Sequence, residues 1–302
     1  MGKIVKRIVL IAFVLLSLAP VLSWAREISP LVSPGWLAAN LQKPNLVILD
    51  IRKVEEYKAG HVPKAVNVFY GSWAIKKADL DNELPDGDDL DDIINSAGIN
   101  DDSLIVIVGK TETTPDLVNT SRVAWTLKYA GLENVAILDG GYAKWIAENR
   151  EISTESVKVT GGNFKAKWNK DIYADKNYIE GKIGKATIVD ARGPEFFFGV
   201  AKLDFVAKAG HIPQAVNLPS AWLFTKEGTF KNKDELKAMA KGVVGENINK
   251  EIIAYCDTGR LASAAWFLFS EILGYKNVRL YDGSMQEWAK DAKAPVVRYS
   301  WQ

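Results

Sequence analysis

The residue best suited to covalent chemistry is Cys256, the only cysteine in the chain. The apolar run from Ile252 to Tyr255 leads directly into it, as expected of a buried strand. From Leu261 to Leu273 the sequence favours a helix, and Gly274 closes that helix. Cys256 is therefore expected at the end of a strand, where a short turn passes into a helix.

A turn of this kind can hold a sulfur anion. Its backbone N–H groups have no partners in the strand or the helix, so several of them can converge on one point. The helix dipole and the side chain of Arg260 add positive charge. Reactive thiols in electropositive loops have a pKa of about 3.5–7.5, against roughly 8.5 for a free thiol. We expect Cys256 to be a nucleophile with a lowered pKa; the alternative is a small buried apolar residue.

The other residues of the turn each have an expected role. Arg260 is expected to contact an anionic substrate, because a guanidinium suits carboxylate and sulfonate-like groups. Asp257 would disfavour a thiolate if it pointed inward, so it should turn outward or pair with a cation. Gly259 is expected to adopt a positive φ, and Leu261 completes the active-site loop.

Residues 1–25 have the pattern of a signal peptide and are excluded from the fold. Basic residues precede an apolar run of 12 residues, Ile8 to Ala19, which is short for a membrane span. Ser23 and Ala25 place small residues where a signal peptidase cleaves. We expect a mature protein that begins near Arg26, lies in a bacterial periplasm or is secreted, and has no membrane span. An uncleaved membrane anchor is the alternative.

Composition excludes several classes of function. The 38 Lys and Arg residues nearly balance the 37 Asp and Glu residues, and no long basic stripe supports nucleic-acid binding. Two histidines and one cysteine do not make a metal site with ligand spacing. The acidic run from Asp79 to Asp92 lacks the spacing of a calcium loop, so we expect a solvated loop and a helix start there. Neither a metal nor another cofactor is predicted.

The chain of 302 residues repeats itself once, with an offset of roughly 140–150 residues that is typical of a duplicated domain. Three segments recur in the same order. They are Val47–Arg52 and Thr187–Arg192, Lys58–Asn67 and Lys208–Asn217, and Leu138–Trp145 and Tyr281–Trp288.

Each half reads as alternating strands and helices. In the first half we expect strands at 46–50, 104–108 and 134–138, and helices that begin at Pro34, near 53–59, at 119–130 and from 141. This order predicts an α/β fold with a doubly wound parallel sheet in each half. The expected boundaries are a first domain at 26–150, a polar linker with Gly-Gly at 151–165, and a second domain at 166–302.

The repeat also separates shared residues from unique ones. It places Gly109 opposite Cys256, so only the second half has a thiol at this point. Ligands of open α/β sheets bind beyond the carboxyl ends of the strands, where Arg192 also lies, so Arg192 is a candidate substrate-binding residue. Asp50–Arg52 and Asp190–Arg192 occur in both halves, and their simplest role is structural. His61 and His211 also recur, and neither is a good candidate for a catalytic base.

These residues together resemble the tandem-domain rhodaneses, which are thiosulfate and mercaptopyruvate sulfurtransferases. The matching motifs are Asp-x-Arg, Gly-His-[Ile/Val]-Pro-x-Ala-x-Asn, Asp-Gly-Gly/Ser…Trp and Cys-x-x-Gly, over essentially all of residues 30–290. The resemblance implies an inactive first domain and an active second one. Cys256 would take the outer sulfur of a small-molecule donor as a persulfide and pass it to a thiophilic acceptor such as cyanide or a thiol.

Two positions depart from the family pattern. Thiosulfate-type members usually have a lysine two residues after the cysteine, whereas mercaptopyruvate-type members have a small hydroxyl residue, which Thr258 resembles more closely. Thr258 is therefore a candidate substrate-binding residue. Both types usually place a second arginine where this chain has Phe196, and Arg260 is expected to replace that cation.

Three functions remain open at this point. The first is a sulfurtransferase that acts on thiosulfate or, alternatively, on mercaptopyruvate. The second is a cysteine phosphatase or arsenate reductase, which usually needs an arginine six residues after the nucleophile, where this chain has Ala262. The third is a non-catalytic persulfide carrier or binding module. Fused halves that resemble each other are consistent with a monomer.

Overall fold

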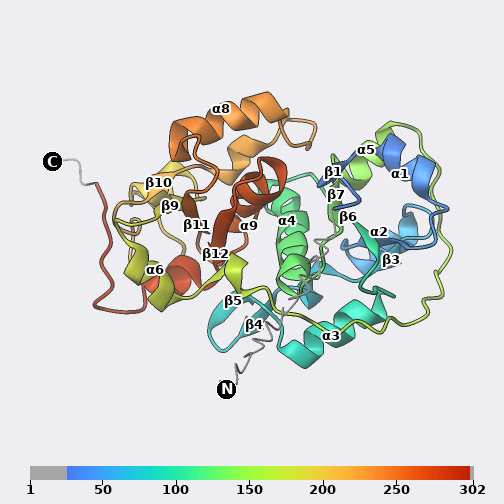
Figure 1. The fold of residues 1–302 in the computed structure, drawn as a ribbon, viewed down its shortest axis with the longest axis horizontal. Helices are drawn as coiled ribbons and strands as arrows, with labels where there is room; N and C mark the ends of the chain where they lie inside the picture. The colour runs from blue at the N-terminus through green and yellow to red at the C-terminus, as the bar shows by residue number, and fades with distance from the viewer. Residues whose placement is uncertain (1–25, 300–302) are drawn as a thin grey trace, which may run out of the picture.

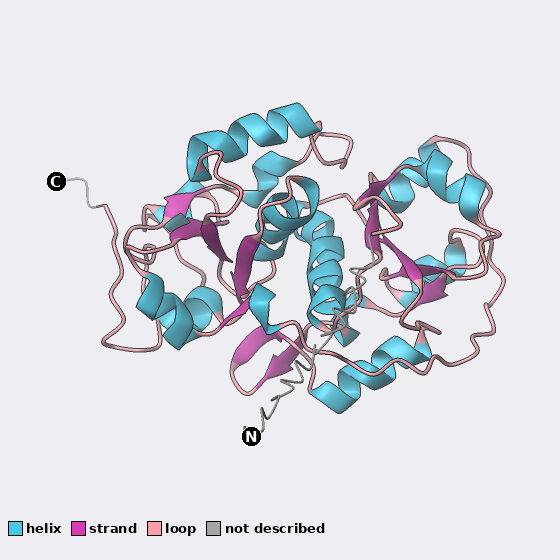
Figure 2. Ribbon diagram, viewed as in Figure 1, coloured by secondary structure: helices cyan, strands magenta, loops and turns pink. Residues whose placement is uncertain are grey.

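Figure 1 shows the computed structural model, which describes residues 26–299. The predicted signal peptide lies outside these residues. Among the residues described, no helix has the length and apolar character that a membrane crossing requires. The first half (residues 26–150) and the second half (residues 166–299) each contain one five-stranded parallel sheet with helices around it (Figure 2). The expected tandem of two doubly wound α/β sheets is confirmed.

The sheet of the first half has the strand order β1-β7-β6-β2-β3. Its strands are β1 (Leu31–Val32), β2 (Leu46–Asp50), β3 (Val66–Asn67), β6 (Leu104–Val108) and β7 (Val135–Leu138). A separate hairpin joins β4 (Ile75–Lys77) to β5 (Leu80–Glu83). The helices of this half are α1 (Pro34–Asn40), α2 (Val54–Ala59), the 3₁₀ turn η1 (Tyr70–Ser72), α3 (Gly87–Ser96), α4 (Thr114–Tyr129) and α5 (Gly141–Ala147).

The sheet of the second half has the order β10-β9-β11-β12-β8, which is the same arrangement read from the other edge. Its strands are β8 (Tyr173–Ala174), β9 (Thr187–Asp190), β10 (Val216–Asn217), β11 (Glu251–Tyr255) and β12 (Asn277–Tyr281). The helices are η2 (Lys170–Ile172), α6 (Lys176–Lys182), α7 (Pro194–Phe197), η3 (Ser220–Leu223), α8 (Lys233–Val244), α9 (Ala262–Phe267), the π-helical turn η4 (Leu268–Ile272) and α10 (Ser284–Trp288).

The two halves share one hydrophobic core. All five residues of β6 are buried, because helices cover both faces of a parallel sheet. The helices α4 and α9 pack against each other at the centre of the molecule, between the two sheets (Figure 1). Trp125 of α4 and Trp266 of α9 are fully buried in the same cluster, which contains residues of both halves. The halves are thereby held together by apolar packing as well as by the chain connection.

Local signals explain the helix boundaries. Helix α4 begins at Thr114, five residues before the expected start, because Thr113 caps it and Pro115 occupies its first turn. The predicted helix over 261–273 is present as α9 followed by η4, and Gly274 follows with φ +78°. The segment 151–165, predicted as the linker, contains no helix and no strand of either sheet. It nevertheless packs against the first half, because Phe164 is buried and its N–H donates to the side chain of Asn95.

The acidic run from Asp79 to Asp92 corrects one expectation. Its second part does begin a helix, α3, but its first part is the β4–β5 hairpin rather than a solvated loop. The backbone N–H of Asp81 donates to Gln286 of α10 at 2.8 Å, and Gln286 donates in turn to the Asp79 carbonyl at 3.1 Å. The hairpin thus packs against the second half. The sequence pattern did not predict this packing, because the contacts are made by backbone groups and a side-chain amide rather than by apolar side chains.

Candidate active site

Cys256 follows β11, the central strand of the second sheet, at its carboxyl end. The strand positions the residue because β11 is hydrogen-bonded to β9 on one side and to β12 on the other. The Cys256 carbonyl accepts the N–H of Met285 at 3.0 Å, which ties the start of the turn to α10. The turn then runs through Asp257 to Leu261 and enters α9 at Ala262. This is the strand, turn and helix order that the sequence predicts.

Three backbone N–H groups point at the Cys256 sulfur, those of Thr258, Leu261 and Ala262. This convergence of amides is the geometry expected for a turn that holds an anion. The side chain is nevertheless deeply buried, with only 1% of Cys256 exposed. Burial, together with the negative charge of Asp257, raises the pKa of the Cys256 thiol despite the three amides. The expected lowering of the pKa is therefore wrong for the described state of the protein.

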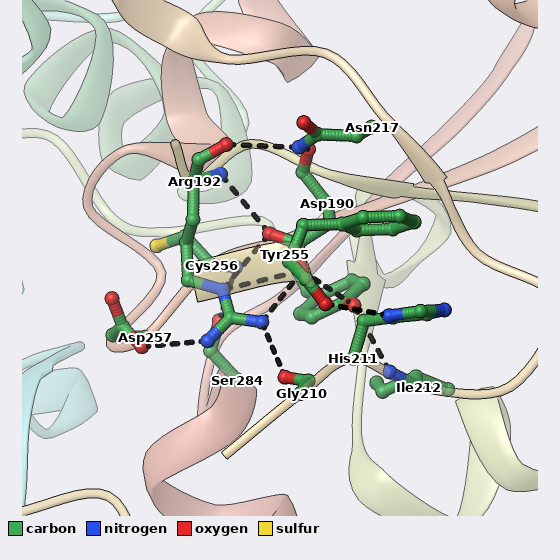
Figure 3. A network of polar contacts seen from close by, with 11 residues as sticks. Asp190, Arg192, Gly210, His211, Ile212, Asn217, Tyr255, Cys256, Asp257 and Ser284 are labelled. Atoms are coloured by element: carbon green, nitrogen blue, oxygen red, sulfur yellow. Dashed lines mark hydrogen bonds and ion pairs between the residues drawn. The ribbon is translucent and has the colours of Figure 1, made fainter. Parts of the chain in front are cut away.

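Asp257 pairs with a cation, as expected. Its carboxylate accepts the Nη1–H of Arg192 at 3.2 Å (Figure 3). Burial raises the pKa of Asp257, while the charge of Arg192 acts in the opposite direction. The ion pair holds the Asp257 carboxylate on the Arg192 side of the loop, but the negative charge of Asp257 still raises the pKa of the Cys256 thiol.

Arg192 is buried and connects the active-site loop to the rest of the second half. It is 1% exposed, and its guanidinium donates to both carboxylate oxygens of Asp190 and to the Gly210 carbonyl (Figure 3). The Tyr255 hydroxyl donates to the same Asp190 carboxylate at 2.8 Å. Because these partners and Asp257 occupy the guanidinium, the geometry favours a positioning role for Arg192 over direct contact with a substrate.

Ser284 secures the loop and was not identified from the sequence. Its hydroxyl oxygen accepts the N–H of Cys256 at 3.1 Å and that of Gly259 at 3.0 Å, and it donates to the Tyr281 carbonyl at 2.8 Å. Ser284 adopts φ +49°, an uncommon value for a residue with a side chain. The Asp-Gly-Ser closure of the repeat, where the first half has Asp-Gly-Gly, is the sequence signal that could have identified it.

Gly259 is required by both its backbone and its surroundings. Its φ is +72°, as expected for this position. A Cβ atom there would lie 2.5 Å from the Asp282 carboxylate and 2.9 Å from a nitrogen of Arg122. Asp282 and Arg122 form an ion pair between the second and the first half, with both side chains almost completely buried. The loop is therefore packed directly against the junction of the two halves.

Thr258 contacts the first half through its side chain. Its hydroxyl oxygen accepts an N–H of Asn82 at 3.0 Å, and the carbonyl oxygen of the Asn82 amide accepts the Tyr70 hydroxyl at 3.0 Å. Asn82 lies in β5 and Tyr70 in η1. Thr258 is 8% exposed, so this part of the loop is covered by the first half. Neither Asn82 nor Tyr70 was identified as a site residue from the sequence pattern.

Arg260 takes an unexpected direction. Its Nε–H donates to Asn119 at 2.8 Å, an Nη2–H donates to the Pro115 carbonyl at 3.2 Å, and its guanidinium lies over the Tyr70 ring. It faces a crevice of about 270 Å³ between the halves, together with Lys53 and Lys110. The partners of its guanidinium therefore come from the first half.

The recurring histidines have equivalent surroundings. His61 Nδ1 contacts the Tyr57 carbonyl and its ring stacks on Tyr57; His211 Nδ1 contacts the Phe197 carbonyl and its ring stacks on Phe197. Burial lowers the pKa of His211. Both rings are part of the packing of their own half.

Both halves of the chain are similar to known proteins. A model of the rhodanese-like domain matches residues 33–148 and again residues 166–291. A Mycolicibacterium smegmatis protein named "Putative thiosulfate sulfurtransferase" is 32% identical over 278 residues, which cover 88% of this chain and 96% of the relative. The "Sulfur carrier protein TtuD" of Thermus thermophilus is 28% identical over 283 residues, 89% of this chain and 96% of the relative.

Solved structures show the same fold. YnjE superposes with a TM-score of 0.79 at 23% identity, over 90% of this chain and 69% of that one. The anaerobic ergothioneine biosynthesis enzyme from Chlorobium limicola superposes with a TM-score of 0.78 at 21% identity, over 90% of this chain and 70% of that one.

Proposed function

Because the chain belongs to the rhodanese-like domain family, with one domain in each half, we propose that it is a sulfurtransferase that carries sulfur on Cys256. The observation that supports this most strongly is the position of the Cys256 sulfur, at the carboxyl end of the central strand and facing the N–H groups of Thr258, Leu261 and Ala262. These donors can stabilise the Cys256 thiolate, and they can also stabilise a persulfide, whose negative charge lies on the sulfur attached to Cys256.

The first half-reaction loads the cysteine. The Cys256 thiol loses its proton, and the thiolate attacks the outer sulfur of thiosulfate. A new S–S bond forms as the bond between the two donor sulfurs breaks, and sulfite leaves with the electron pair. The product is a Cys256 persulfide. Since the residue is 1% exposed, the groups that cover the loop must move to admit the donor.

The second half-reaction unloads it. An acceptor such as cyanide attacks the outer sulfur of the persulfide, the S–S bond breaks, and the electron pair returns to the Cys256 sulfur. Thiocyanate leaves and the thiolate is regenerated, so the cycle needs no external oxidant or reductant. Because each half-reaction is completed before the next begins, ping-pong kinetics are expected.

Thiosulfate is the proposed donor, and mercaptopyruvate is the alternative. The name of the M. smegmatis relative favours thiosulfate, whereas the hydroxyl residue Thr258, in place of a lysine, favours mercaptopyruvate. The relation to the sulfur carrier of T. thermophilus supports a third possibility, in which a protein thiol receives the sulfur. All three share the Cys256 persulfide.

The test is a donor panel on the protein without residues 1–25. Thiocyanate formation from cyanide is measured with thiosulfate and with mercaptopyruvate, for wild type and Cys256→Ser. We expect turnover in wild type with thiosulfate as the better donor, and none in Cys256→Ser. Faster turnover with mercaptopyruvate would identify mercaptopyruvate, rather than thiosulfate, as the donor. Persulfide formation without turnover would indicate a carrier, and no reaction with either donor would contradict sulfur transfer.

We further propose that the protein is exported as a monomer and cleaved after Ala25, which rests on the N-terminal sequence pattern. The intact mass of the protein from a periplasmic fraction tests this. A mass that begins at Arg26 is expected, and a mass that retains residues 1–25 would indicate an uncleaved anchor.

A further inference from the structure

Asn82 lies at the point where the first half contacts the active-site loop. It belongs to β5, in the hairpin that packs on the second half. Its amide N–H donates to the Thr258 hydroxyl oxygen at 3.0 Å, across 176 residues of sequence. The cysteine and its three amide donors all belong to the second half. This bond is therefore a polar contact from the first half, which has no cysteine, to the loop that holds the sulfur.

The side chain of Asn82 is held firmly in this position. Its amide oxygen accepts the Tyr70 hydroxyl at 3.0 Å, and its backbone carbonyl accepts an N–H of Arg122. Arg122 is itself fixed by the ion pair with Asp282. Asn82 adopts φ +61°, a left-handed conformation that asparagine tolerates better than most residues. These two contacts, with Tyr70 and with Arg122, thus hold the Asn82 amide N–H towards Thr258.

The contact determines what the Thr258 hydroxyl can do. A hydroxyl group has one hydrogen to donate and oxygen lone pairs that accept. Asn82 donates to the hydroxyl oxygen, and among residues 26–299 the hydroxyl hydrogen of Thr258 has no hydrogen-bond acceptor. The backbone N–H of the same residue points at the Cys256 sulfur. The hydroxyl hydrogen is consequently available within the loop that holds the sulfur.

We propose that Asn82 is a positioning residue for sulfur transfer, which orients the Thr258 hydroxyl as a hydrogen-bond donor to the anionic sulfur donor bound at Cys256. The proposal rests on the proposed sulfurtransferase function. The proposed ligand is a small anion with sulfonate-like or carboxylate oxygens. As the bond to its outer sulfur breaks, negative charge increases on the leaving group. A hydroxyl with its accepting side occupied is well suited to stabilise that charge.

The test is a double-mutant cycle with Asn82→Ala and Thr258→Val, the latter being close in shape to threonine but without its hydroxyl. Two rates are measured in all four proteins: persulfide formation from thiosulfate in a single turnover, and alkylation of Cys256 by iodoacetamide. Loss of one uncharged hydrogen bond predicts about a tenfold slower sulfur transfer for Asn82→Ala. In the Thr258→Val background the same change should have almost no further effect, because Asn82 acts through the missing hydroxyl.

Asn82→Asp reverses the polarity at almost constant shape. A carboxylate has no hydrogen to donate and accepts the Thr258 hydroxyl hydrogen, which removes it from the substrate. We expect a larger loss of transfer rate than for Asn82→Ala. The matched control is Asn149→Ala, because Asn149 has a similar φ of +52° but lies in an exposed turn after α5. It should transfer sulfur at the wild-type rate, which separates backbone strain from the role of the amide.

The outcomes separate this proposal from the function on which it rests. Wild-type sulfur transfer with equal and additive losses in the two single variants would overturn the role of Asn82 and leave the function intact. If wild type forms no persulfide, the function fails, and the alkylation cycle then decides the role of Asn82. Non-additive alkylation rates would support coupling of Asn82 to Thr258 at the cysteine loop, and additive rates would overturn it.

Discussion

The two halves of the molecule share a scaffold and differ at the tip of one strand. In the first half, Arg52 donates to the Asp50 carboxylate and to the Gly60 carbonyl. In the second half, Arg192 makes the same bonds to Asp190 and Gly210, with closely similar distances. Because these bonds occur both in the half with the thiol and in the half without one, we infer that they maintain the fold of each half.

The differences are concentrated around Cys256. Gly109 takes its place in the first half, and its carbonyl accepts the Tyr142 N–H at 3.0 Å, just as the Cys256 carbonyl accepts that of Met285. Tyr142 also lies 3.6 Å below the Arg52 guanidinium. In the second half Met285 replaces this ring, and the corresponding arginine pairs with an aspartate of the loop instead. The corresponding strand ends of the two halves thus differ at a few positions, and only the strand end of the second half has a thiol.

The interface between the halves has a matching pattern. The first-half hairpin places Asn82 against the Cys256 loop, and in the second half the turn that contains Gly228 lies against Thr111, in the loop after Gly109. Each half therefore covers the strand-end loop of the other. Since only one of these loops contains a cysteine, the duplication has left one half to cover the site and the other to carry the sulfur.

The largest expected effect comes from moving the thiol. Cys256→Ser should abolish sulfur transfer, and adding Gly109→Cys to it should not restore any. A Cβ atom at Gly109 would lie 2.6 Å from a methyl group of Thr120, so the first-half loop has no space for the side chain. Thiocyanate formation measures this. Activity in the double variant would show that the two strand ends are equivalent.

The next effect concerns Ser284, which replaces Gly141 of the first half. Ser284→Ala leaves the buried N–H groups of Cys256 and Gly259 without their acceptor, at a cost of about 1–3 kcal/mol each. We expect the free energy of unfolding to fall by about 2–6 kcal/mol in denaturant titrations. The exposed Ser96→Ala should change it by less than about 0.5 kcal/mol. An equally small change for Ser284→Ala would show that its hydroxyl does not hold the loop.

A smaller effect is expected at Asp257, which raises the pKa of the Cys256 thiol by its negative charge. Asp257→Asn keeps an acceptor for Arg192 but removes that charge, so the thiol pKa should fall. Since the thiolate is the reactive form, alkylation at pH 7 should become up to about tenfold faster, and its pH profile should shift to lower pH. Asp204→Asn, an exposed change, serves as the control. An unchanged profile would contradict the assigned cause.

The last expected effect is a pH dependence at the interface between the halves. Burial and the charge of Asp282 raise the pKa of Glu83 to about 7. Because an unfolded glutamate has a lower pKa, the folded state binds the additional proton, so this group lowers stability as pH rises from about 4.5 to about 7. Glu83→Gln should match wild type near pH 4 and be more stable at pH 8, by thermal unfolding. Equal stability at both pH values would contradict this.

Local sequence signals predicted much of the scaffold. Cys256 lies after a strand because an apolar run precedes it, and Gly259 has the expected positive φ because the turn is too tight for other residues. The repeat predicted the tandem arrangement and the structural role of the Asp190–Arg192 pair. These features depend on nearby residues or on comparison within the chain.

The features that the sequence did not reveal depend on contacts between distant segments. Asn82 reaches Thr258 across 176 residues, and Ser284 reaches Cys256 across 28. The direction of the Cys256 pKa was mispredicted for the same reason, since burial by the packed halves outweighs the loop amides. The direction of the long Arg260 side chain could not be predicted for a similar reason, because its partners Asn119 and Pro115 belong to the other half.

The most direct measurement is the intact mass of the protein after incubation with thiosulfate, followed by peptide mapping. We expect a gain of about 32 Da on the peptide that contains Cys256, lost on addition of cyanide and absent in Cys256→Ser. No gain in mass, or a gain that persists in Cys256→Ser, would contradict the assignment of sulfur transfer to the loop of the second half.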